Sequence, residues 1–135
     1  MAQNTSPIFP GVPRNVGLSV VGASAITART AITGTTGLSL LFTAGANGSR
    51  IDQTTFTTTG TTLAGIIDIW VYDGTTSRLL QEVVFTVITP NTTTTVGATS
   101  IVSYANLVLP TGYGLYCSSQ VASQLIGAIT AGGDY

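Results

Sequence analysis

Residues 64–88 read AGIIDIWVYDGTTSRLLQEVVFTVI, two apolar segments joined by a short polar stretch. β-Branched and aromatic residues dominate both segments, and much of their apolar content recurs at every second position, as it does along β-strands. The Asp73-Gly74 pair between them is a strong turn signal. This stretch therefore predicts an antiparallel β-hairpin.

The apolar residues of this hairpin also predict its register. Paired strands place their apolar residues on the same side of the sheet. Ile67 on the first strand and Val83 on the second belong to these apolar faces, and joining them requires an odd number of loop residues, three or five. In that register Arg78 lies on the same face as Trp70 and Tyr72.

The rest of the chain from Leu18 onward resembles the hairpin in composition. No stretch shows the apolar spacing of a helix, and turn signals recur about every 8–12 residues, a pattern typical of sandwiches, jelly rolls and barrels. The expected strands are 17–30, 37–43, 50–58, 64–72, 78–88, 94–104, 106–109 and 113–129, the last interrupted near Ser119. The sequence therefore predicts an all-β fold with a single antiparallel β-sandwich or jelly-roll-like domain.

The N-terminal residues 1–16 differ from the rest, because they contain three prolines. Proline provides no backbone N–H group and is excluded from helix interiors and central strands. We therefore expect an extended N-terminal arm over residues 1–16 and the β-domain over residues 17–135. Ile8 and Phe9 lie between the first two prolines, and we expect them to anchor the arm on a neighbouring subunit.

The charge content excludes several classes of function. Charged residues make up 7% of the 135 residues, against about 25% in an ordinary soluble domain, and the formal net charge is -1. The four cations are all arginines and form no basic cluster, so we expect no nucleic-acid partner. The apolar runs are shorter than the roughly 18 residues of a membrane span, so no membrane partner is expected, and the N-terminus carries no recognisable export signal.

The residue types needed for most enzyme chemistry are also scarce. The chain has no histidine and no lysine, and Cys117 is its one cysteine, which we expect to be buried in a strand. We therefore predict no catalytic residue, no metal site and no cofactor. One alternative is a carbohydrate-active enzyme, which needs two carboxylates roughly 5–9.5 Å apart. Asp68 and Glu82 could lie together on one sheet face, although ordinary surface carboxylates are the favoured interpretation.

The low charge content favours assembly into a larger particle. Free β-domains protect their exposed strands with lysine, proline or inward-pointing charge, and this chain has almost none of these after residue 16. The segments 38–42 and 83–88 would promote aggregation if they were left open. We therefore expect a symmetric homo-oligomer, most simply a homotrimer, in which subunit contacts cover these strands.

Several short motifs resemble a known group of proteins. They are FTAGANGSRI at 42–51, TLAG at 62–65, YDG at 72–74 with RLLQE at 78–82, LPTG at 109–112 and AGGDY at 131–135. Together they resemble small virion structural proteins of tailed bacteriophages, of the capsid decoration or cement type. The resemblance implies a trimeric sandwich or jelly roll that binds between major capsid protein subunits on the surface of the phage head, after assembly in the host cytoplasm. It transfers no catalytic residue.

These arguments define a set of expected contact residues. The residues expected to contact another subunit or the capsid are Ile8, Phe9, Pro10, Arg14, Arg50, Trp70 and Arg78. Arg50 and Arg78 are expected to form ion pairs or hydrogen bonds that anchor structure. The alternative function is a phage tail or fibre adhesin, or a glycan-binding β-module, in which Trp70, Tyr72 and Arg78 form a platform for a sugar.

Overall fold

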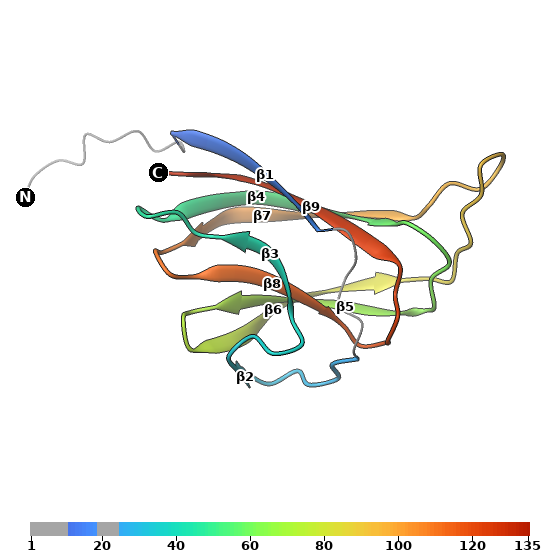
Figure 1. Ribbon diagram of the computed structural model, residues 1–135, viewed down its shortest axis with the longest axis horizontal. Helices are drawn as coiled ribbons and strands as arrows, with labels where there is room; N and C mark the ends of the chain where they lie inside the picture. The colour runs from blue at the N-terminus through green and yellow to red at the C-terminus, as the bar shows by residue number, and fades with distance from the viewer. Residues whose placement is uncertain (1–10, 19–24) are drawn as a thin grey trace, which may run out of the picture.

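The computed structural model describes residues 11–18 and 25–135, and these residues form nine strands and no helix (Figure 1). This confirms the predicted all-β fold. The strands are β1 (Val12–Leu18), β2 (Ile32–Thr33), β3 (Ser39–Thr43), β4 (Ser49–Thr58), β5 (Gly65–Tyr72), β6 (Thr76–Phe85), β7 (Thr99–Leu109), β8 (Gly114–Ser119) and β9 (Ile126–Asp134).

The strands form two antiparallel sheets, one of four strands in the order β1-β9-β4-β7 and one of five in the order β2-β6-β5-β8-β3. Apart from the two-residue β2, the pairing follows one rule: the first strand pairs with the last, β3 with β8, β4 with β7, and β5 with β6. A chain that pairs in this way is one long hairpin wound into a two-sheet sandwich, which is the jelly-roll topology. The predicted sandwich or jelly roll is thus confirmed.

A single hydrophobic core fills the space between the sheets. Phe56 of β4 and Phe85 of β6 meet there edge to face, with ring centroids 6.4 Å apart. Cys117 is buried in the same core as expected, and burial raises the pKa of its thiol to about 12. The fully buried side chains of the core include Leu41, Phe42, Ile51, Phe56, Ile67, Ile69, Leu109, Leu115 and Ile126.

The hairpin of β5 and β6 joins its apolar faces by a different device from the one expected. Ile67 does pair with Val83, but Tyr72 pairs with Ser77, so that four residues lie between this last pair. An even number of loop residues would by itself place the two apolar faces on opposite sides of the sheet. A β-bulge restores the match, because the register shifts by one residue between Ile69 and Trp70. As a result Arg78 pairs with Val71, and the expectation that it shares a face with Trp70 is wrong.

The start of the domain also differs from the prediction. Residues 12–18 form an edge strand of the four-stranded sheet, so the assignment of residues 12–16 to an extended arm is wrong. The expected strand over 17–30 is wrong over residues 26–30, which form no strand, and its residues 19–24 lie outside the described part of the chain. Pro13 fits in β1 because one side of an edge strand donates no ladder hydrogen bonds. Near the C-terminus, the expected interruption at Ser119 is confirmed, since β8 ends there.

Candidate functional site

The two outer faces of the sandwich differ in their chemistry. In β4, Thr54 and Phe56 are buried in the core, so Thr55 and Thr57 point outward by strand alternation. Thr55 pairs with Ile129 on one side and with Ile101 on the other. These two isoleucines are 59% and 61% exposed, which is unusual for large apolar residues on one sheet row. The row extends to β1, where the partner of Ile129 is a glycine.

We call this surface the uncharged face. It comprises the outward residues of three neighbouring rows, which are Asn15, Gly17, Gln53, Thr55, Thr57, Thr99, Ile101, Ser103, Gly127, Ile129 and Ala131. Arg50 and Asp52 lie at one end of it, on β4, and their side chains form an ion pair at 2.9 Å. The rest of the face presents hydroxyl, amide and aliphatic groups, which impose no charge-desolvation cost on a partner.

The uncharged face contains a hollow of about 230 Å³ at the end of β1. Gly127 provides no side chain beside Thr57, whereas Ile129 stands two residues along on the same strand. Among the residues that the structure describes, those that line the hollow are Leu18, Thr55, Thr57, Thr59, Gly127, Ala128 and Ile129. These residues are all uncharged, so the hollow is suited to an apolar side chain.

The outer face of the five-stranded sheet instead carries a polar cluster. Asp68 of β5 and Glu82 of β6 are direct cross-strand partners, which confirms that they share a face. The side-chain amide of Gln120 donates to both Asp68 oxygens, at 3.0 and 3.1 Å, and to Glu82 Oε1 at 3.2 Å. Arg29 then pairs with Glu82 at 2.8 Å. The cluster ties strands β5 and β6 to two segments distant in sequence.

Burial raises the pKa of Asp68 above its ordinary value, and the neighbouring charge of Glu82 adds to this rise. Hydrogen bonding by Gln120 and the charge of Arg29 act in the opposite direction but do not cancel it. In the pH window between the ordinary and the raised pKa, the folded state binds more protons than the unfolded state. Asp68 therefore contributes stability that is complete below its ordinary pKa and is lost as pH rises through the raised value.

The substitution Asp68→Asn is expected to abolish this pH dependence, because the amide cannot ionise. The difference in unfolding free energy between the variant and the wild type should shift in favour of the variant as pH rises from about 3 to 7. Urea denaturation across this range measures the difference. Asp52→Asn is the matched control, since Asp52 is an exposed carboxylate on the other sheet. A constant difference for Asp68→Asn would contradict the expectation.

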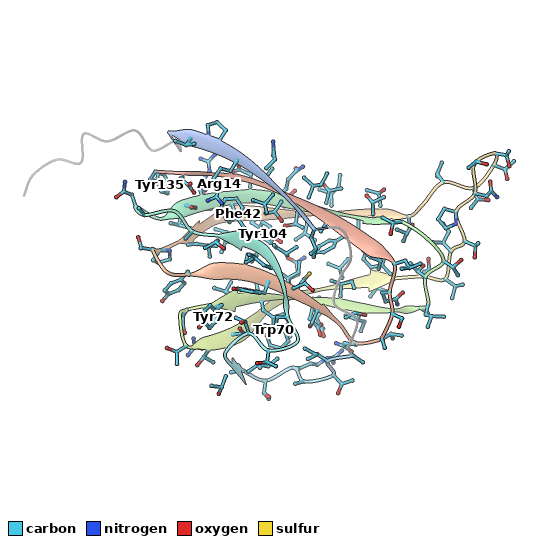
Figure 2. All side chains as sticks on the ribbon, in the orientation of Figure 1. Arg14, Phe42, Trp70, Tyr72, Tyr104 and Tyr135 are labelled. Atoms are coloured by element: carbon cyan, nitrogen blue, oxygen red, sulfur yellow. The ribbon has the colours of Figure 1, made fainter. Side chains whose placement is uncertain are left out.

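A third cluster closes the end of the sandwich near the C-terminus. Arg14 donates to Asp134 at 2.9 and 3.0 Å and to the carbonyl of Thr43 at 3.0 Å, and its guanidinium lies 4.4 Å from the centre of the Phe42 ring (Figure 2). The hydroxyl of Ser49 also donates to Asp134, and this bond is the main reason that the pKa of Asp134 is lowered. The cluster fastens β1 to β3, β4 and β9.

The predicted contact residues are spread over different parts of the molecule. Arg14 and Arg50 belong to the four-stranded sheet and are ion-paired, while Arg78 pairs with Asp73 at the β5–β6 turn. Trp70 is fully buried, so its assignment as a contact residue is wrong. The aromatic platform proposed for a sugar fails with it. Ile8, Phe9 and Pro10 lie outside the described residues.

The sequence reasoning did not single out Ile101 and Ile129, the most prominent side chains of the uncharged face. Ile101 is followed by one other branched aliphatic residue, Val102, and Ile129 lies between Ala128 and Thr130, so neither belongs to a long apolar run. They stand out only when the register brings them to opposite sides of Thr55. The sequence signal that could have indicated them is an isoleucine at a strand position that alternation places on the outer face of the sheet.

The described residues hold no group of three or more potential metal ligands, and none of their segments forms a helix able to cross a membrane. Comparison of the chain with protein-family models, with curated proteins and with solved structures finds no match.

Proposed function

We propose that this chain is a non-enzymatic structural protein that functions as a subunit of a larger assembly. More particularly, we propose that it is a capsid decoration protein of a tailed phage, which binds between major capsid protein subunits and stabilises the head. The observation that carries the proposal is the uncharged face with its two exposed isoleucines. The short motifs that resemble phage decoration proteins support the same assignment.

Contact with a partner would bury the exposed isoleucines of the uncharged face and so stabilise the assembly. Complete burial of an isoleucine side chain contributes roughly 1.5–3 kcal/mol, and Ile101 and Ile129 have more than half of their surface left to bury. A shell repeats each contact many times, so a modest gain per subunit stabilises the whole particle. In a free monomer the same face would be an aggregation hazard.

The two alternatives have weaker support. The glycan-binding function depended on Trp70, which is buried. The carbohydrate-active enzyme depended on Asp68 and Glu82, and the amide of Gln120 donates to both of these carboxylates. The two carboxylates accept hydrogen bonds from Gln120, so the arrangement joins strands of the sheet.

The proposal requires a major capsid protein in the same genome, and the test is binding of this chain to phage heads that are assembled from that protein and expanded without this chain. We expect the double variant Ile101→Lys/Ile129→Lys to bind at least 100-fold more weakly than the wild type, because two buried lysines would lack partners. Val84→Lys/Val87→Lys is the matched control, since these valines are 72% and 65% exposed and lie in and just after β6 of the other sheet. Sedimentation of heads with bound protein measures occupancy.

Two results would count against the proposal in different ways. If the wild-type protein does not bind the heads, the decoration function is wrong. If the wild type binds and the isoleucine variant binds equally well, the decoration function stands but the uncharged face is not the contact. Urea denaturation of both double variants must show wild-type stability, so that a loss of binding reports on the surface.

A further inference from the structure

The hollow of the uncharged face has the size and chemistry to receive one large apolar side chain. Its volume is about 230 Å³, and a dry apolar cavity of roughly 150 Å³ is enough to hold a benzene molecule. Ile129 and Leu18 contribute aliphatic surface, and Thr55 and Thr57 contribute methyl groups next to Gly127. An aromatic or branched aliphatic side chain therefore fits without leaving a buried charge unpaired.

The N-terminal residues contain such side chains at Ile8 and Phe9, but they cannot reach the hollow of their own chain. The hollow lies at the Leu18 end of β1, and six residues of extended strand separate it from Val12 by about 20 Å. Phe9 lies three residues before Val12, a reach of about 11 Å at most. A chain reversal through residues 10 and 11, the shortest common hairpin connection, returns Phe9 only to the level of Val12.

We infer that the segment around Ile8 and Phe9 of one copy occupies the hollow of a neighbouring copy. This inference rests on the proposed function as an assembling subunit, and it names the partner of the hollow as a second copy of this chain. Each copy then donates one segment and receives another. Such a head-to-tail contact is heterologous, and it forms a ring of subunits where the rotation between neighbouring copies closes.

The position of β1 supports an exchange between copies. β1 is the edge strand of the four-stranded sheet, and its first residues lie beside the C-terminal end of β9 (Figure 1). Leu18, which lines the hollow, is at the opposite end of β1. Val12 pairs with Asp134, and Arg14 is bound to the same carboxylate. The start of β1 is therefore fixed at the sheet edge, at the opposite end of the strand from the hollow.

The test measures self-association by sedimentation equilibrium in the absence of capsids. Thr57→Trp fills the hollow, and Ile8→Ala/Phe9→Ala removes the anchors in the full-length chain. We expect each variant to weaken association at least 100-fold. Ser103→Trp is the matched control, because Ser103 lies on the same face outside the hollow and should associate as the wild type does.

A mixing experiment identifies the contact as an exchange between copies. The Thr57→Trp variant keeps its anchors, and the Ile8→Ala/Phe9→Ala variant keeps its hollow. An equimolar mixture should therefore form heterodimers at concentrations where each variant alone is monomeric. Association of Thr57→Trp at the wild-type level, or a mixture that stays monomeric, would overturn the inference.

Other outcomes separate this inference from the proposed function. If the loss of Ile8 and Phe9 weakens binding to phage heads but leaves self-association unchanged, the major capsid protein is the partner, and the exchange between copies is wrong while decoration stands. If Thr57→Trp lowers the melting temperature of the monomer and leaves association unchanged, the hollow belongs to the chain's own fold and the inference is wrong. Self-association through the hollow by a protein that never binds heads would support the exchange and refute decoration.

Discussion

Trp70→Ala is expected to lower the free energy of unfolding by about 3–5 kcal/mol, the usual cost of removing a large buried aromatic side chain. Trp70 has no exposed surface, and its indole N–H donates to Ser118 Oγ at 2.9 Å. Its strand neighbours are Leu79 on β6 and Tyr116 on β8. Figure 2 shows it in the lower sheet, remote from the surface that β1, β9, β4 and β7 present.

The controls for Trp70 separate packing from hydrogen bonding. Trp70→Phe keeps much of the ring and removes the indole N–H, so it should cost less than Trp70→Ala. Ser118→Ala removes the same hydrogen bond from the other side, and leaving the buried indole N–H without a partner should cost about 1–3 kcal/mol. Urea denaturation of the isolated protein measures all three. A loss below about 1 kcal/mol for Trp70→Ala would be incompatible with full burial.

The Trp70 experiment also decides between a structural and a contact role. A contact residue would lower binding to phage heads while leaving the isolated protein unchanged. A buried structural residue lowers the stability of the isolated protein first. We expect the second result, in agreement with the correction that the fold imposes on the sequence-based assignment.

Gly132→Ala is expected to cost about 3 kcal/mol, at the upper end of ordinary overpacking. A Cβ atom at this position would lie 2.4 Å from the carbonyl oxygen of Arg50 and 3.2 Å from the Cα of Ile51, and both are backbone atoms that cannot rotate away. Gly132 lies opposite the register shift of β4, where β4 and β9 approach closely. The substitution should therefore separate the two central strands of the four-stranded sheet.

Gly17→Ala is the matched control for this substitution. Gly17 lies on β1 of the same sheet, and a Cβ atom there meets nothing within 4 Å. Its unfolding free energy in urea should stay within about 0.5 kcal/mol of the wild type, as for most surface substitutions. Equal losses for the two glycines would show that glycine is required for backbone freedom in general and not for the close approach of β9 to β4.

The class of fold can be predicted from local sequence, because strand formation depends on alternation within single segments. The expected strands 50–58 and 64–72 agree closely with β4 and β5, and the interruption near Ser119 was predicted from local composition. The sequence also indicates that Asp68 and Glu82 could share one sheet face, since residues in one hairpin are related by a short turn, and in the structure they pair directly.

Other features depend on partners that are distant in sequence, and local patterns do not predict them. The bulge of β6, which separates Arg78 from the face of Trp70, adds one residue that the alternation cannot reveal. β1 forms although it contains a proline, because β9 at the other end of the chain provides a paired edge. The uncharged face has the same origin. Ile101 and Ile129 are 28 positions apart in the sequence, and they form one surface because both pair with Thr55 of β4.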